Sequence, residues 1–291
     1  MSLVTLKQSN KQLFVESSGE GPALVFLHGL GSSTTFWSAS LELSQLAKTR
    51  RLVKVDLDGH GLSPVSSPTS GKGGKLGIDD LVQDLRQLLD ALGIDRAAGL
   101  CGHSMSGVRV YLSGPSYCYC FCADTRPQLV CATFASLYPE RVSKLFLLGP
   151  VKAMPAAACK NMLHRAALVR EGGMPAVVDT VVAGAVSAPS RERNPLSPAI
   201  VRALLMPTKP EGYARACEAL AEAQDPDWDK VGAQETLIVG GELDYLVKPE
   251  DVDFLTTNIK RARSVTLKGC GHWHAVEQPE AVAKLLSDFF A

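Results

Sequence analysis

The sequence predicts an α/β fold with a mostly parallel central sheet flanked by helices, and two observations lead to that prediction. Short, continuously apolar runs alternate along the chain with longer segments whose apolar residues recur at helical spacing. The short runs contain few polar residues, which is typical of parallel strands that are buried on both faces. At 291 residues, the chain is long enough for one large domain or two smaller ones of this class.

The strand candidates are spaced so that a helix can lie between them. Residues 23–27 are apolar throughout and predict a buried strand. Residues 13–17 alternate, and they predict a strand of a hairpin that ends near residues 19–22, where glycine and proline gather. Further strands are expected at residues 52–56, 97–101, 144–148, 236–239 and 264–267.

Helices are expected between these strands and at the end of the chain. The clearest one covers residues 78–92, where leucines and a valine keep helical spacing and Gly93 ends the pattern. The other helices that flank the sheet are expected around Trp37 and at residues 129–137 and 279–290.

The strand–helix rhythm is lost between residue 151 and about residue 230. This block lies between two strands of one sheet, so we expect it to fold as a helical cap over the strand ends and to wall off a pocket. The expected division is a core of residues 1–150 and 231–291 and a cap of residues 151–230. The cap helices are expected at residues 156–169, 175–185, 198–205 and 213–223.

Composition and charge favour a cytoplasmic protein without a nucleic-acid or membrane partner. The chain has 30 basic and 30 acidic residues, which gives no electrostatic reason to expect binding to polyanions. No apolar run approaches the roughly 20 residues of a membrane span, and the first twelve residues lack the apolar centre of a signal peptide. The oligomeric state is not predicted.

The eight cysteines are expected to be reduced and mostly buried. None forms a C-x-x-C pair, so neither a zinc site nor a thioredoxin-like motif is indicated. We therefore expect neither a metal nor a cofactor.

The segment Gly102-His103-Ser104-Met105-Ser106-Gly107 is the centre of the predicted chemistry. It follows an apolar run and places a serine between small residues, which is typical of a strand-to-helix turn that exposes a nucleophile. Such an elbow needs small residues two positions before and two after the serine. Gly102 meets the first need, and Ser106 meets the second only approximately. A serine in an ordinary glycine turn is the alternative.

The segment after this elbow does not fit the pattern. A helix should begin directly after Gly107, and residues 129–137 supply one if residues 108–128 are removed. Val108-Arg109-Val110 can be encoded like a splice donor, and Gln128 like an acceptor. We hypothesise that residues 108–128 are a translated, unspliced intron, with a genuine surface insertion as the alternative. If the segment is present, we expect it to reduce activity and stability.

A serine nucleophile requires a base and a group that orients the base. His272 follows the last predicted strand and is the expected base, with His274 as its local competitor. Asp244 follows the preceding strand and is the expected acid, with Glu242 as the alternative. The remaining histidines are His28, His60, His103 and His164.

Two backbone N–H groups are expected to stabilise an oxyanion. Met105 follows the nucleophile, and Leu30 lies in the glycine-rich loop after residues 23–27. The residues expected to contact the substrate are His28, Gly29, His103 and Trp273.

These motifs together resemble the α/β-hydrolase superfamily over the whole chain outside residues 108–128. The matching stretches are His28-Gly29-Leu30-Gly31, Asp56-Leu57-Asp58-Gly59-His60-Gly61-Leu62-Ser63, Gly102-His103-Ser104-Met105 and Gly271-His272. The resemblance implies the α/β-hydrolase fold with a helical cap and a catalytic triad in the order Ser, Asp, His. Ser106 stands where the family pattern has glycine, and residues 108–128 have no counterpart in it.

Within the superfamily, the chain is similar to the 3-oxoadipate enol-lactonase type, on three shorter stretches: residues 170–174, 210–214 and 277–280. This similarity implies a serine hydrolase that opens a carboxylate-bearing enol-lactone, or cleaves a small carboxylic ester, through an acyl-serine. A cap arginine, either Arg165, Arg170 or Arg215, could pair with the carboxylate. The alternatives are a carbon–carbon bond hydrolase, an acyltransferase, a cofactor-free haloperoxidase or a non-catalytic ligand-binding protein.

Overall fold

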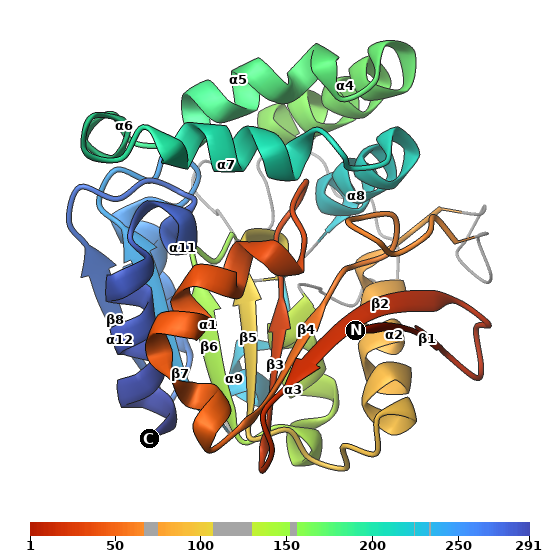
Figure 1. Cartoon of the computed structure of the whole chain (residues 1–291), viewed down its shortest axis with the longest axis vertical. Helices are drawn as coiled ribbons and strands as arrows, with labels where there is room; N and C mark the ends of the chain where they lie inside the picture. Colours follow the sequence, from red (N-terminus) through yellow and green to blue (C-terminus); the bar gives the residue numbers. More distant parts are fainter. Residues whose placement is uncertain (67–74, 107–129, 152–155, 224, 233) are drawn as a thin grey trace, which may run out of the picture.

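The computed structural model describes residues 1–66, 75–106, 130–151, 156–223, 225–232 and 234–291 (Figure 1). These residues form one eight-stranded sheet with the order β1-β2-β4-β3-β5-β6-β7-β8. β1 and β2 pair with each other in antiparallel fashion, β2 pairs with β4 in the same way, and every later pairing is parallel. The strands are β1 (Ser2–Thr5), β2 (Gln12–Ser18), β3 (Ala23–Leu27), β4 (Arg51–Val55), β5 (Gly99–His103), β6 (Lys144–Leu148), β7 (Glu235–Gly241) and β8 (Ala262–Leu267).

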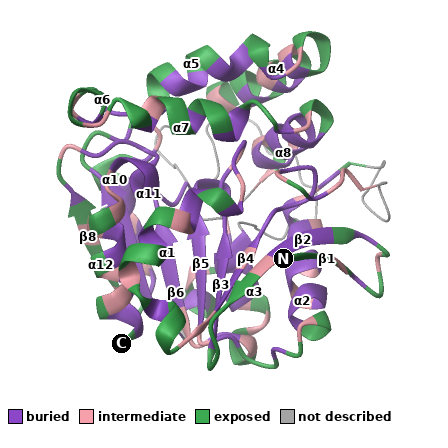
Figure 2. Cartoon of the chain, in the orientation of Figure 1, coloured by how far each residue is buried: buried purple, intermediate pink, exposed green. Residues whose placement is uncertain are grey.

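The central strands are buried because helices cover both faces of the sheet. Along β3, Val25 and Leu27 belong to one apolar cluster, whereas Leu24 and Phe26 belong to the other. This alternation is the period of two that a strand imposes on its side chains. Figure 2 shows the strands buried along the middle of the molecule. The fold class predicted from the apolar runs is therefore confirmed.

Two groups of helices enclose the sheet. α1 (Ser38–Ser44) and α12 (Pro279–Phe290) pack together on one face. On the other face lie α2 (Ile78–Ala91), α3 (Val130–Leu137), α9 (Trp228–Val231) and α10 (Pro249–Asn258). Short helical turns complete the connections: η1 (Thr34–Trp37), η2 (Leu46–Lys48), η3 (Ser104–Ser106), η4 (Pro139–Arg141) and α11 (His274–Glu277).

Five helices form a layer beyond one end of the sheet (Figure 1). We call them the helical layer: α4 (Ala156–Gly172), α5 (Pro175–Ala185), α6 (Ala188–Arg193), α7 (Leu196–Leu205) and α8 (Pro210–Glu222). α4 packs against both α5 and α8, and α7 packs against α5. The layer lies above the carboxyl ends of the parallel strands, which is where ligands bind in open α/β sheets.

The early strand expected at residues 13–17 is β2, and it forms a hairpin with β1 that ends at Ser18, just before residues 19–22. β3, which follows these residues, does not pair with β2, because β4 lies between them in the sheet. The antiparallel partner of β2 on its outer side is β1, an exposed edge strand with little apolar patterning to predict it.

The fifth strand differs from its prediction. It covers Gly99–His103 rather than residues 97–101, so it runs directly into Ser104. The helices α6, α9, α10 and α11 were not predicted. The proposed intron, residues 108–128, lies outside the described residues.

Within the described ranges, no helix combines the length and the apolarity that crossing a bilayer needs. In the same part of the chain, Cys101, Cys131, Cys217 and Cys270 are free, buried thiols.

Candidate active site

Ser104 lies at the carboxyl end of β5, in a backbone conformation that residues other than glycine rarely adopt. Its φ is +52°, in the left-handed region. Gly29 packs against this turn from the loop after β3, and a Cβ on Gly29 would lie 2.9 Å from the Cβ of Ser104. The turn thus points the hydroxyl off the end of the sheet, with only 9% of the residue exposed.

A chain of two hydrogen bonds links Ser104 to a carboxylate. The Ser104 hydroxyl donates to His272 Nε2 over 2.8 Å, and His272 Nδ1–H donates to Asp244 Oδ2 over 2.7 Å. The second carboxylate oxygen, Oδ1, accepts the N–H groups of Leu246 and Val247 at 2.8 and 3.0 Å. The structure therefore brings together the three side chains that the motifs singled out.

The charge of Asp244 is stabilised although the group is buried. Burial alone would raise the pKa of this carboxyl, but the charge and hydrogen bond of His272 outweigh it and hold the pKa below its usual value. An ionised Asp244 fixes the His272 tautomer, with a proton on Nδ1 and a free lone pair on Nε2 facing the serine.

The two N–H groups expected to stabilise an oxyanion flank Ser104. Leu30 lines the cavity at the serine, and Met105 follows Ser104 in the η3 turn. Among the described residues, no loop or turn hydrogen bond of the backbone uses either N–H. Both can therefore donate to a developing negative charge.

Of the residues expected to contact the substrate, His103 and Trp273 line the cavity with Ser104. The His103 ring stacks on Phe36, with centroids 4.1 Å apart, and its Nε2–H donates to the carbonyl of His272 over 2.9 Å. Burial, and then His272 and His274, hold the pKa of His103 well below its usual value. His103 is thus a neutral wall of the cavity.

His28 and Gly29 are not among the described residues that line the cavity. His28 is fully buried, donates through Nδ1–H to the carbonyl of Gly29 over 2.7 Å and accepts the N–H of Leu57 at Nε2 over 3.0 Å. Both ring nitrogens therefore bind backbone, and burial lowers the pKa of His28 to about 4. The two residues support the loop that carries Leu30 rather than a ligand.

The competing base and acid lie elsewhere. His274 is fully buried, and its Nε2 is 3.8 Å from Asp244 Oδ2; burial lowers its pKa to about 4 in spite of the opposing charge of Asp244. Glu242 is exposed and accepts the N–H of Gly269 over 2.8 Å. Neither shares the hydrogen-bond chain to Ser104.

The helical layer and the core together enclose the cavity over Ser104. Apolar side chains dominate its walls, and Arg165 is the one charged side chain from the helical layer among the described lining residues. The lining comprises Leu30, His103, Ser104, Val151, Met162, Arg165, Val181, Ala185, Tyr213, Leu220, Tyr245, Leu246, His272 and Trp273.

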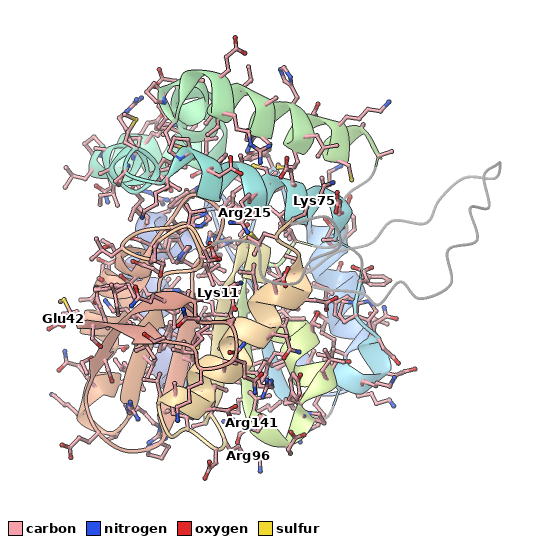
Figure 3. The ribbon with its side chains drawn as sticks, turned by 90° about the vertical axis from the view of Figure 1, so that its right-hand side faces the viewer. Lys11, Glu42, Lys75, Arg96, Arg141 and Arg215 are labelled. Atoms are coloured by element: carbon pink, nitrogen blue, oxygen red, sulfur yellow. The ribbon has the colours of Figure 1, made fainter. Side chains whose placement is uncertain are left out.

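The three candidate arginines differ in their surroundings. Arg170 is held on the exterior by ion pairs with Glu211 and Glu218 at 2.8 and 2.5 Å. Arg215 is buried where α8 meets the underlying loop (Figure 3) and donates to the carbonyl of Ser66 over 2.7 Å. Only Arg165 of the three reaches the cavity.

Arg165 interacts with two tyrosines of the same cavity. The side chains of Tyr213 and Tyr245 lie close to its guanidinium, and despite its burial they together raise its pKa. Burial raises the pKa of both phenols above the usual value, so they stay neutral. The motifs did not reveal either tyrosine.

Glu277 is a second group that the motifs did not mark as functional. It is buried beside the His272 loop, whereas its position just before Pro279 suggests an ordinary helix-start acid. Among the described residues, no cluster of three or more histidine, cysteine or acidic side chains could hold a metal ion.

Comparison with known proteins agrees with this geometry. A family model described as the alpha/beta hydrolase family matches residues 24–285. The 3-oxoadipate enol-lactonase 2 of Acinetobacter baylyi is 30% identical to this chain over 264 residues, which cover 89% of this chain and 85% of the relative.

Two solved structures are similar over nearly the whole chain. An enol-lactonase from Burkholderia xenovorans LB400 has a TM-score of 0.80 at 25% identity and covers 99% of both chains. A thermophilic esterase from Thermogutta terrifontis has a TM-score of 0.82 at 23% identity, over 99% of this chain and 97% of the other. The second likeness is one of fold.

Proposed function

Because the chain belongs to the alpha/beta hydrolase family, we propose that it is a serine hydrolase that cleaves a small carboxylic ester or lactone through an acyl-serine intermediate. The observation that carries the proposal is the hydrogen-bond chain from Ser104 through His272 to Asp244, with spacings of 2.8 and 2.7 Å.

In the acylation step, Ser104 Oγ attacks the carbonyl carbon while His272 Nε2 takes the hydroxyl proton. The negative charge that develops on the carbonyl oxygen faces the N–H groups of Leu30 and Met105. His272 then gives its proton to the leaving oxygen as the carbon–oxygen bond breaks. In a lactone, that oxygen stays tethered to the acyl group.

In the deacylation step, the roles are repeated with water. His272 takes a proton from a water molecule, whose oxygen attacks the acyl carbon, and returns the proton to Ser104 Oγ as the acid leaves. Asp244 remains ionised throughout and stabilises the imidazolium that forms in each step.

The substrate class is proposed to include a free carboxylate, with Arg165 as its partner. The support is the position of Arg165 in a cavity with mostly apolar walls, where a guanidinium makes strong, paired hydrogen bonds to carboxylate. The enol-lactonase names of the relatives favour a lactone of this kind. In this proposal the helical layer is the cap that selects the substrate.

A panel of aryl esters, simple lactones and enol-lactones tests the function, assayed on the full chain and on a chain lacking residues 108–128. We expect hydrolysis of at least one class, together with labelling of Ser104 by a fluorophosphonate. Ser104→Ala should abolish labelling and lower kcat by about 10³-fold or more, because the nucleophile is lost. Ser106→Ala, in the same turn, is the matched control and should keep both.

The form that lacks residues 108–128 is expected to be the more active and the more stable one. α3 follows this segment in the sequence, and it contacts η3 and β5. The helix that supports the nucleophile turn is therefore separated from that turn by residues 108–128 along the chain. Absence of both labelling and hydrolysis in the two forms would contradict the proposal and favour a ligand-binding role.

A further inference from the structure

We propose that Glu277 is a positioning residue for the base: its carboxylate holds the His272 loop against the junction of α5 and α6. The inference rests on the proposed function, since it assigns Glu277 to the same site. Glu277 lies in α11 and touches neither Ser104 nor the imidazole of His272 by a hydrogen bond between described residues.

The Glu277 carboxylate accepts hydrogen bonds from both neighbours of His272. Oε2 accepts the N–H of Gly271 over 2.9 Å, and Oε1 accepts the N–H of Trp273 over 3.1 Å. The peptide groups on either side of the imidazole are therefore fixed to one buried anion. Hydrogen bonds to a charged acceptor are about twice as strong as neutral ones.

The third donor comes from the helical layer. The N–H of Ser187, which precedes α6, donates to Glu277 Oε2 over 3.1 Å. Nearby, the N–H of His272 itself donates to the carbonyl of Ala185 over 3.0 Å, and the Ser187 hydroxyl donates to the carbonyl of Gly269 over 2.8 Å. Two direct hydrogen bonds and one through the Glu277 carboxylate thus connect the end of α5 to the His272 loop.

The joint is too tight for a side chain at Gly271. A Cβ there would lie 2.8 Å from Glu277 Oε1 and 2.9 Å from both the carbonyl oxygen of Ala185 and the nitrogen of Ser187. Such packing leaves the backbone of the loop few alternative positions.

This arrangement is more than the cap of a helix end. Trp273 is the N-cap of α11, so the bond from its N–H to Glu277 is one that a helix start commonly makes. The bonds from the N–H groups of Gly271 and Ser187 lie outside α11, and they bind the His272 loop and the α5–α6 connection to the same carboxylate. Ala185 lines the cavity, so the wall contributed by α5 and the base share one anchor. The position of His272 relative to Ser104 therefore depends on Glu277.

Glu277→Gln tests the role, because it keeps the shape and one acceptor but turns an N–H₂ group toward a peptide donor. We expect kcat to fall about 10- to 100-fold with KM within about 2-fold, since a base displaced by about 1 Å loses rate rather than affinity. Glu280→Gln removes an exposed carboxylate three residues on and should leave both constants unchanged.

A second pair of variants tests the link to the helical layer without altering Glu277. Ser187 has φ −62° and follows an extended residue, so its backbone conformation is compatible with proline, which removes the N–H donor and places its ring beside the Glu277 carboxylate. Ser187→Pro should lower kcat below that of Ser187→Ala, which loses the hydroxyl but keeps the N–H. Equal kcat values in the two variants would contradict the link.

Amide hydrogen exchange separates this inference from the proposed function. In Glu277→Gln, the amides of Gly271, Trp273 and Ser187 should exchange at least about 10-fold faster than in the parent, whether or not the chain hydrolyses esters. Unchanged exchange, or a wild-type kcat in Glu277→Gln, would overturn the inference. Lack of hydrolysis in the parent with faster exchange in the variant would remove only the catalytic part.

Discussion

The backbone of Ser104, the proposed nucleophile, has an unfavourable conformation. A non-glycine residue at φ +52° costs on the order of 1 kcal/mol or more, and in this chain that residue is the one bonded to His272. The close approach of Gly29 to Ser104 leaves no room for the turn to relax toward the β3 loop. Packing against Gly29 therefore maintains the strained turn, as expected where a turn must expose a nucleophile at the end of a sheet.

Arg165 is expected to favour substrates that carry a carboxylate. Arg165→Met should raise KM for a carboxylate-bearing ester by about 10- to 100-fold, the value of a charge-assisted hydrogen bond, and change KM for a neutral ester by less than about 2-fold. Steady-state kinetics on the two substrates measure the difference. Arg170→Met is the control, because Arg170 is occupied by Glu211 and Glu218 outside the cavity. Equal effects on the neutral and charged esters would count against a carboxylate partner.

The sequence could supply the residues that follow strands, but it supplied only Arg165, as one of three candidate arginines, from the helical layer. Ser104, Asp244 and His272 could be selected because each follows a strand end, and parallel strands bring their carboxyl ends to one edge. Tyr213 and Tyr245 carry no motif, and their role depends on how α8 and the loop after β7 pack. The sequence left His28 open for a related reason: a histidine in a glycine loop can face a ligand or bind backbone, and in the structure both of its ring nitrogens bind backbone.

At the scale of elements, the helical layer meets the core through a backbone contact. Gly212, in the first turn of α8, lies against Gly59 in the loop after β4, and a Cβ on Gly212 would be 2.3 Å from the Gly59 carbonyl oxygen. Close by, Lys209 donates to the carbonyls of Gly61 and Ser63 at 2.9 and 3.0 Å. α8 is thus fixed on the core one residue before Tyr213 enters the cavity.

Gly212→Ala should therefore destabilise the protein and disturb the cavity together. The added methyl meets backbone atoms that cannot move aside, so we expect a loss of about 1–3 kcal/mol in unfolding free energy and a higher KM through displacement of Tyr213. Thermal unfolding and kinetics measure the two effects. Gly77→Ala is the control: its Cβ would meet its nearest neighbour at 3.5 Å, with an expected cost of about 1 kcal/mol or less at this helix start. A Gly212→Ala protein as stable as the control would show that the contact can relax.

Helices and strands could be predicted where their apolar residues keep a clear period. The strand order could not be predicted, because it depends on which strands pair in the sheet. The helix at α2 and the strand at β6 could be located because their apolar residues match one period. The partner of β2 could not be, since an antiparallel strand at a sheet edge pairs with whichever neighbour the crossover leaves beside it. α10 combines a mixed composition with only a few buried residues, so its pattern is weak.

Across the whole molecule, buried histidines set the dependence of stability on pH. Burial lowers the pKa of His28, His60 and His274 to about 4 each and holds that of His103 well below its usual value. In the unfolded chain these imidazoles take up protons near pH 6.5. As pH falls from about 6.5 toward 4, the unfolded state therefore binds more protons and the fold loses stability.

Buried carboxyls oppose this loss only in part. Burial raises the pKa of Asp84 to about 6, and that of Asp56 in the same direction. Because an unfolded carboxyl titrates near 4, these two groups add stability as pH falls from about 6 toward 4. The pKa of Asp244 is lowered, so its contribution to the stability of the fold is lost only at still lower pH. The four histidines outnumber the opposing groups, and they act first on acidification.

Thermal unfolding from pH 7.5 to 5.5 tests the balance. The unfolding temperature should fall by on the order of 5–10 °C, since each differential proton is worth about 1.4 kcal/mol per pH unit and a chain of this size shifts by about 2 °C per kcal/mol. His274→Leu removes one buried imidazole whose ring nitrogens have no hydrogen-bond partner among described residues. It should make the decline shallower, whereas His164→Leu, at an exposed position, should leave the slope unchanged. An unfolding temperature that stays constant over this range would mean that the buried histidines take up protons without unfolding the chain, and that the cavity wall at His103 changes charge with pH.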